Sequence, residues 1–406
     1  MITKSGSNAL HGALYDFERH SVTDANYFFN NKSGLALPSW SRHQFGANTG
    51  GPIKRNKWFF YGDYEGLRQG VPNTQISTLP TPLQVAGNFS QTHASNGSLI
   101  TIYDPSTLVT LANGTYQRSP FPNNTIPASE INPVSAAVAK YYPAPNLPGN
   151  PVTGALNYVY APEQTVSIDK YDVRSDVNLT DKTRLFDRFS QERDQRYTPG
   201  AMPLPIGGGG SVWDTFTQEV IDVNHVFSPT TVADLNISGL RGKAAQKGAT
   251  WGFNVGSLGL PANYTSVALP YFPVYTMSDV LGTDQAAPSD ALQTRPRNVF
   301  SLEGSVSHQH GKHSLKFGED TRWFHFNEYQ HNQGSGHFTM SRGFTQGPNP
   351  TQASTTGGYD FASFLLGDAS SGSIQTTSPM STQGSYYGLY AQDDWKVTSR
   401  SGFVGK

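Results

Sequence analysis

Three histidines close together in the chain could in principle hold a metal ion. His308, His310 and His313 form an H-x-H-x-x-H pattern across a predicted tight turn, and imidazole nitrogens are common metal ligands. The alternative is a polar hairpin tip, which is the interpretation we adopt. We therefore predict no metal site and no bound cofactor.

The sequence gives no pattern for catalysis. Ser, His and Asp all occur, but no G-x-S-x-G, H-E-x-x-H or Walker pattern is present, and there is no cysteine. Nothing in the spacing of the 30 acidic residues selects an acid/base pair. The run Gly207–Gly210 follows no strand and precedes no helix with a lysine, so it is predicted to be a flexible loop tip. We expect a protein that is not an enzyme.

Composition limits the class of fold and of partner. The 29 basic and 30 acidic residues balance, so no nucleic acid is expected as a partner. The 41 glycines, 27 prolines and 12% aromatic residues favour turns and strands over a helical bundle. No apolar stretch of about 18 residues could form a transmembrane helix. The N-terminus lacks the apolar core of a secretory signal, which fits either a cytoplasmic protein or a piece of a longer one.

Polar and apolar residues alternate with a period of two in several segments. This pattern predicts strands that have one face in an apolar environment and the other in a polar one. In Tyr171–Leu179 one face is mostly apolar, whereas Asp172, Arg174 and Asp176 occupy the other. Asn298–Gln309 repeats the pattern, with Glu303 on its polar face. About ten such strands are predicted, within residues 10–17, 43–49, 57–66, 171–179, 183–193, 215–227, 232–240, 298–309, 313–326 and 385–397.

Short and long connections alternate strictly between these strands. Tight turns join the second strand to the third, the fourth to the fifth, the sixth to the seventh and the eighth to the ninth. All tight turns then lie at one end of the sheet, as in an antiparallel up-and-down transmembrane barrel with long outer loops. The long loops cover residues 18–42, 67–168, 194–214, 241–297 and 327–384, with short helices predicted at Pro133–Tyr141, capped by Asn132, and at Asp360–Leu366.

The barrel interpretation assigns sites to the two faces. Asp172, Arg174, Asp176 and Glu303 are predicted to face the lumen, as solvated wall charges or as groups that contact a solute or brace a plug. Aromatic residues suit the girdles at the membrane interfaces, with an aromatic platform for sugars as the alternative. Asp187 falls on an apolar face and is poorly suited to lipid. The girdle is predicted to contain Trp58, Tyr64, Tyr171, Tyr387 and Trp395, with Tyr15, Tyr61, Trp323 and Tyr390 as further candidates.

Several segments resemble the barrel of TonB-dependent outer-membrane receptors, in particular the Oar-like branch. They run in family order along nearly the whole chain, from Thr3 to about Val397, and the likeness of HSLKFG to a strand start favours the hairpin tip over a metal at His313. The matching runs are GSNALHGALYDF (6–17), DANYFF (24–29), QFG (44–46) with GGPI (50–53), WFFYGDYEGLR (58–68), GNFS (87–90), IYDP (102–105), NTIP (124–127), HSLKFG (313–318) and YAQDDWKV (390–397).

The resemblance implies a receptor that binds a scarce solute and takes it up with energy supplied through TonB. Its partners would be outer-membrane lipid, the TonB complex through a plug segment, and a small solute such as a siderophore, a carbohydrate or a peptide. Residues 1–398 would be part of a larger barrel and 399–406 a cut end, with signal peptide, plug and remaining strands absent. The competing hypothesis is a soluble or secreted all-β protein, a carbohydrate-binding sandwich or an adhesin.

Overall fold

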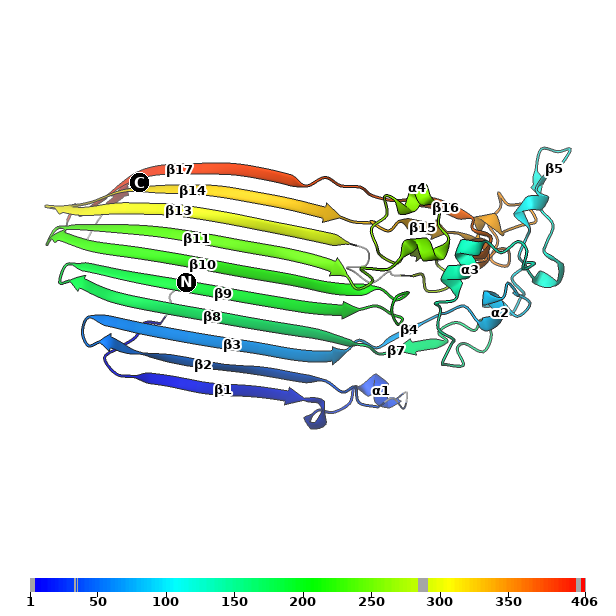
Figure 1. Ribbon diagram of the computed structural model, residues 1–406, viewed down its shortest axis with the longest axis horizontal. Coiled ribbons are helices and arrows are strands. Elements are labelled where there is room, and N and C mark those ends of the chain that lie inside the picture. Colours follow the sequence, from blue (N-terminus) through cyan, green and yellow to red (C-terminus); the bar gives the residue numbers. More distant parts are fainter. Residues whose placement is uncertain (1–3, 33, 35, 284–290, 399–402, 406) are drawn as a thin grey trace.

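The protein is built on one antiparallel sheet of eleven strands, seen in a computed structural model that describes residues 4–32, 34, 36–283, 291–398 and 403–405. Ten strands are long, and β18 is a short strand at one edge (Figure 1). The order across the sheet is β1 (His11–His20), β2 (Ser41–Lys54), β3 (Trp58–Pro72), β8 (Glu163–Thr180), β9 (Thr183–Pro199), β10 (Gly209–Ser228), β11 (Thr231–Gly248), β13 (Leu292–His310), β14 (His313–His331), β17 (Met380–Trp395) and β18 (Phe403–Gly405).

Connections between the strands alternate as predicted. Tight turns join β2 to β3, β8 to β9, β10 to β11 and β13 to β14 at one end of the sheet, and every long connection leaves from the other end (Figure 1). The predicted all-β, up-and-down fold is confirmed. The strands run further into the predicted loops than expected, so the long connections shrink to residues 21–40, 73–162, 200–208, 249–291 and 332–379.

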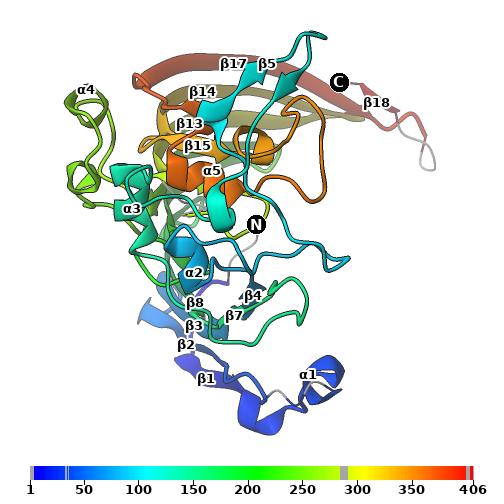
Figure 2. The same cartoon turned by 90° about the vertical axis from the view of Figure 1, so that its right-hand side faces the viewer.

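The sheet is a single curved layer (Figure 2). Its strands pair only with sequence neighbours in that sheet, and the remaining strands form small ladders of three, two and two strands within the loops. The sandwich alternative is therefore wrong, because no second large sheet packs against the first in the described residues. The small strands are β4 (Gln75–Ser77), β5 (Val109–Thr110), β6 (Tyr116–Gln117), β7 (Tyr158–Tyr160), β12 (Val274–Thr276), β15 (His337–Met340) and β16 (Ala369–Ser373).

Helices in the described part of the chain are short and lie in the loops. Two of them confirm predictions: α3 (Pro133–Ala139) is capped by Asn132, whose side chain accepts from the amides of Val134 and Ser135, and α5 spans Asp360–Leu366. None of these helices is long and apolar enough to cross a membrane. The others are α1 (Phe28–Lys32), α2 (Pro82–Val85), α4 (Ala262–Thr265) and the 3₁₀ turns Ser21–Thr23, Pro105–Thr107, Pro122–Asn124, Val255–Leu258 and Arg342–Phe344.

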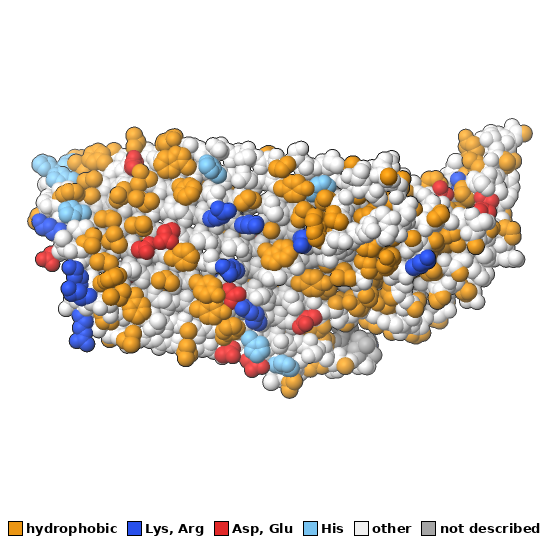
Figure 3. Space-filling model, viewed as in Figure 1, with side chains coloured by type: hydrophobic (Ala, Val, Ile, Leu, Met, Phe, Trp, Pro, Cys, Tyr) orange, Lys and Arg blue, Asp and Glu red, His pale blue; other side chains and the backbone are white. Residues whose placement is uncertain are grey.

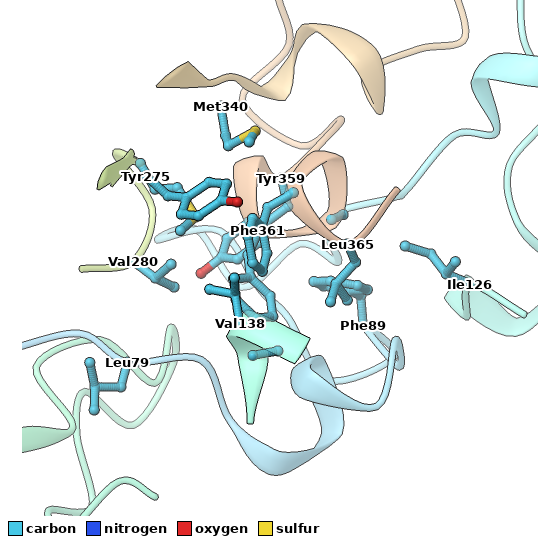
Figure 4. Packing of buried hydrophobic residues seen from close by; sticks show 14 of the residues in the cluster. Leu79, Phe89, Ile126, Val138, Tyr275, Val280, Met340, Tyr359, Phe361 and Leu365 are labelled. Carbon is cyan, nitrogen blue, oxygen red and sulfur yellow. The ribbon is translucent and has the colours of Figure 1, made fainter. Parts of the chain in front are cut away.

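The hydrophobic core lies in the loops rather than in the sheet. Residues 73–162, 200–208, 249–283 and 332–379 pack together at one end of the sheet, and we call this unit the loop cap (Figure 2). Phe361 and Leu365 of α5 belong to its buried centre, together with side chains from residues 73–162, 249–283 and 332–379 (Figure 4). Further members are Leu79, Phe89, Ile102, Ile126, Val138, Met202, Ile206, Phe272, Tyr275, Val280, Met340, Tyr359 and Phe364.

One loop prediction was wrong. The run Gly207–Gly210 is buried rather than a flexible tip, and Gly209 and Gly210 already belong to β10. A Cβ atom on Gly207 would lie within 1.7 Å of the carbonyl oxygen of Met202. The glycines are thus explained by close backbone approach, which lets this connection fold back on itself.

Candidate functional site

The predicted lumen residues of β8 share one face of the sheet. Asp172, Arg174 and Asp176 alternate along the strand, and Arg174 makes two hydrogen bonds to the Asp176 carboxylate, at 2.9 and 2.7 Å. The Arg174 guanidinium also lies 4.3 Å from the centre of the Phe186 ring. Asp172 accepts a hydrogen bond from the Ser190 hydroxyl on β9. These charges are therefore held by neighbours on the polar face instead of being free.

The structure does not bring Glu303 to the same place. Glu303 on β13 lies 3.4 Å from Arg322, and Arg322 makes hydrogen bonds of 2.7 and 2.6 Å to Asp320, both on β14. The strand register puts Asp176 and Glu303 in one row on the same face, but three strands lie between β8 and β13. Four strand spacings separate the two side chains by roughly 19 Å. The polar face thus carries two separate charge clusters.

Sequence reasoning missed the partners of the first cluster. A hollow of about 290 Å³ on this face is lined by Asp172 and Arg174 together with Lys4, Tyr61, Asp63, Asn48 and Arg188. Three basic and two acidic side chains line it, so the hollow has no strong net charge. The sequence does place Asp63 and Arg188 at polar positions of predicted strands, so both could have been named as candidates for the polar face. Only the register shows that they meet.

The five predicted girdle residues all point away from the charged face. The register pairs Trp58 with Val177, Tyr64 with Tyr171, and Tyr387 with Thr321, and places Trp395 opposite His313. Trp58 and Trp395 lie at the tight-turn end, where the Trp58 indole donates to Ser175 at 2.8 Å. Tyr64 and Tyr171 lie six residues further along the strands, a rise of about 20 Å. Figure 3 shows one broad face of the molecule, with hydrophobic side chains spread over the strands.

Three of the further aromatic candidates lie on the opposite face. Tyr15 donates to Glu65, Tyr61 lines the charged hollow, and Tyr390 lies 6.0 Å from the Lys316 ammonium group. These side chains therefore belong with the polar face, because a strand residue shares its face with the residue directly opposite. Asp187 does lie on the outward face, where its acidic neighbour is Glu219 of β10 and its Oδ1 atom has no hydrogen-bond partner among the described residues.

The histidines of the H-x-H-x-x-H pattern turn to different partners. The His308 ring bonds the Thr231 hydroxyl at 2.9 Å, and the His313 ring bonds Asp393 at 2.7 Å while stacking on Trp395 at 5.5 Å. Within the part of the chain that the structure describes, no group of three or more His, Cys, Asp and Glu side chains could hold a metal ion. His308 and His313 thus make side-chain contacts between neighbouring strands.

A charged cluster with two buried carboxylates, those of Asp279 and Asp360, joins two long loops inside the cap. Arg342 makes a bidentate contact with Asp279, with Nε at 3.0 and 2.9 Å from its two oxygens. The amides of Ser278 and Asp279 donate to Oδ2 of Asp360, and the Asp360 amide donates to Asp279 at 3.0 Å. Residues 249–283 and 332–379 are thereby tied together. Sequence reasoning predicted the helix that begins at Asp360, but not that its first carboxylate is buried.

The electrostatics of this cluster centre on Asp360. Its side chain is 1% exposed, and its Oδ1 atom has no hydrogen-bond partner. Burial raises the pKa of Asp360 to about 7, and the nearby Asp279 carboxylate adds to the increase. Burial likewise raises the pKa of Tyr142, Tyr275 and Tyr359 around it. The cluster therefore contains a carboxyl group, that of Asp360, whose protonation changes near neutral pH.

Comparison with known proteins agrees with this architecture. A family model described as outer membrane beta barrel domain matches residues 2–400. Similar solved structures include the outer membrane transporter YddB from Escherichia coli, with a TM-score of 0.49 and 8% identity over 96% of this chain and 37% of that one. The FrpB iron transporter from Neisseria meningitidis has a TM-score of 0.42 and 8% identity, over 98% of this chain and 42% of its own.

The ferric-catecholate import receptor Fiu from Escherichia coli has a TM-score of 0.41 and 11% identity, over 97% of this chain and 45% of its own. The chain thus spans less than half the length of these three proteins. Comparison with curated protein sequences gave no match. Because the family model covers almost every residue, this chain belongs to the outer membrane beta barrel domain family and is a protein of the outer membrane.

Proposed function

We propose that this chain forms part of the wall and the outer loops of a TonB-dependent receptor of the Oar-like branch. In the intact receptor these loops would bind a scarce solute outside the cell, before energised uptake through the barrel. The proposal is supported by family membership, by the ordered series of Oar-like motifs and by the loop arrangement. No catalytic role is assigned to any residue, and contact with the TonB complex is assigned to a plug segment, as the resemblance implies.

The loop cap is the observation that carries the proposal. Ordering long loops costs conformational entropy that a buried core must offset. Here Phe361, Phe364 and Leu365 are fully buried among other loop residues. Such a core holds the outer surface in a fixed shape, which is what selective binding of a solute requires.

The two faces of the sheet support the same role. We assign Asp172, Arg174, Asp176 and Glu303 to a water-filled lumen, where paired charges provide a polar wall. We assign the outward aromatic residues to lipid contact. At a strand tilt of 35–45°, the rise from Trp58 to Tyr64 corresponds to ~15 Å across the membrane, and that from Trp395 to Tyr387 to ~20 Å. These heights fall within an apolar band of about 25 Å.

Uptake measurements in cells test the proposal. The intact receptor to which the proposal assigns this chain would be expressed in a host that lacks its own outer-membrane receptors, and accumulation of ferric catecholate, maltohexaose and a neutral hexapeptide would be followed with and without a protonophore. We expect one of the three to accumulate, and the protonophore to abolish its accumulation. Accumulation that is insensitive to the protonophore would mean a passive channel, and no accumulation of any probe would contradict a receptor for these solute classes.

A further inference from the structure

A polar groove crosses the loop cap between two segments of its longest loop. Residues 81–93, which include α2, form one wall, and residues 148–157 form the other. Its volume of about 600 Å³ lies in the range of small-molecule sites. Among the described residues, no Asp, Glu, Lys or Arg lines it, and its titratable side chains are His93 and Tyr359.

The floor of the groove is fixed by internal hydrogen bonds. Gln84 accepts from the Thr81 amide at 2.8 Å and donates to the Thr92 hydroxyl at 3.0 Å. Asn157 holds the backbone of Leu79 from both sides, at 2.7 and 2.9 Å. Gln84, Thr92 and Asn157 are all buried. A ligand would therefore meet a surface that is already organised and costs little to order.

The rim of the groove presents both hydrogen-bond donors and a hydrogen-bond acceptor to a ligand. The side-chain oxygen of Asn88 accepts from the Ser90 amide at 2.9 Å, and that of Asn150 accepts from the amides of Val152 and Thr153 at 2.9 and 3.0 Å. These turns use the amide oxygens and leave the NH₂ groups as donors. The His93 Nδ1 atom lies 3.0 Å from the Gln91 carbonyl oxygen, which leaves Nε2 of the neutral ring as an acceptor.

We propose that this groove binds a neutral, polyhydroxylated ligand, a short glycan chain. A hydroxyl group both donates and accepts, so it fits a rim of amide donors and a histidine acceptor. An anionic chelate would find no counter-charge in the lining. Exposed apolar side chains beside the amides, Leu83 at 39% and Val152 at 44%, suit the C–H faces of sugar rings. The inference rests on the proposed function, because it makes the cap the part of the receptor that meets the solute.

Binding to a glycan array tests the ligand class. The full chain in detergent micelles would be applied to printed neutral and acidic glycans, and the strongest hit measured by calorimetry beside a neutral hexapeptide and ferric catecholate. We expect a neutral glycan to bind. The measurement needs no transport, so a protein that binds glycan yet fails to take it up would contradict the proposed function alone. Preference for acidic glycans, for the peptide or for the chelate, or no binding at all, would overturn the inference.

Paired amide substitutions test the site. Asn88→Asp with Asn150→Asp keeps the side-chain oxygens that hold the two turns and removes the donors. The matched control is Asn96→Asp with Asn113→Asp, because these exposed residues form the same kind of turn outside the groove, at 3.0 Å to Ser98 and Thr115.

The groove variant should bind about tenfold more weakly or worse, since it has lost two hydrogen-bond donors to the ligand. The control should bind like the original chain. Val152→Trp, on the exposed rim, should block the groove without disturbing the fold, as checked by circular dichroism. Equal affinity in the groove variant and in the control, or undiminished binding by Val152→Trp, would overturn the site.

Discussion

The buried carboxylate of Asp360 makes the stability of the loop cap depend on pH. Its pKa is raised from 3.8 to about 7 in the folded state, mainly by burial. The stability that the cap gains from a protonated Asp360 is therefore complete below pH 3.8, the pKa of this carboxyl group in the unfolded chain. It is lost as the pH rises through about 7, the pKa in the folded state. At about 1.4 kcal/mol per pKa unit, the cap should lose roughly 2–3 kcal/mol between pH 5 and pH 8.

Asp360→Asn should remove this dependence. The asparagine oxygen can accept from the amides of Ser278 and Asp279, as Oδ2 does now. Its NH₂ group would take the place of Oδ1, which has no partner. The variant should thus resemble the protonated protein at every pH. It should be more stable than the original by roughly 1.5 kcal/mol at pH 5 and by roughly 4 kcal/mol at pH 8, because the unfolded original is already ionised above its ordinary pKa of 3.8.

Hydrogen exchange with mass spectrometry measures the effect locally. Peptides that cover residues 272–283 and 359–366 would be followed at pH 5, 6, 7 and 8, with intrinsic exchange rates corrected for pH. Asp181→Asn is the control, because Asp181 is exposed in a tight turn at the opposite end of the sheet. A cap whose protection is flat from pH 5 to 8, or a pH slope unchanged by Asp360→Asn, would refute the reasoning.

Three further substitutions separate the cap from the sheet. Arg342→Ala removes the ion-pair partner of the Asp279 carboxylate, which is 6% exposed. The free energy of unfolding of the cap, measured by hydrogen exchange, should fall by about 2–3 kcal/mol. This is less than the roughly 3–5 kcal/mol of a fully buried pair, because Arg342 is partly solvated. Phe361→Ala empties the centre of the core and should cost about 3–5 kcal/mol in urea unfolding; a loss below 1 kcal/mol would contradict the packing described. Leu389→Arg places a charge on the outward face of β17, where the side chain is 86% exposed, and should lower folding stability in lipid vesicles by about 2–4 kcal/mol, whereas Thr382→Arg on the inward face should fold normally.

The strands were predictable because their signal is local. Alternation such as Asp172, Arg174 and Asp176 against Tyr171 and Val173 is written in consecutive residues, and the order of tight turns then determines the topology. The ends near the cap were missed because alternation fades there: β8 begins at Glu163 and β11 continues to Gly248 through mixed polar sequence. Backbone pairing with a neighbour extends these strands, and pairing leaves little trace in the side chains.

The cap was not predictable for the opposite reason. Its core joins Leu79, Val138, Phe272 and Phe361 from loops that lie far apart in the sequence, and no period within any one loop marks them. The Asp279–Arg342–Asp360 cluster has the same origin, because a buried carboxylate is recognised only when the loops that bury it are in place. Face assignment failed for Tyr15, Tyr61 and Tyr390 since aromatic type alone does not decide the direction of a side chain.

The two parts of the molecule are stabilised in different media. The sheet turns apolar side chains such as Val173 and Leu389 outward, so its hydrophobic free energy is realised only when lipid covers that face. The cap buries its apolar side chains against each other and needs water around it. A substitution in the cap should therefore have the same effect in detergent and in membranes, whereas an outward strand substitution should depend on the surrounding lipid. The cap should then keep its shape when the lipid around the sheet changes.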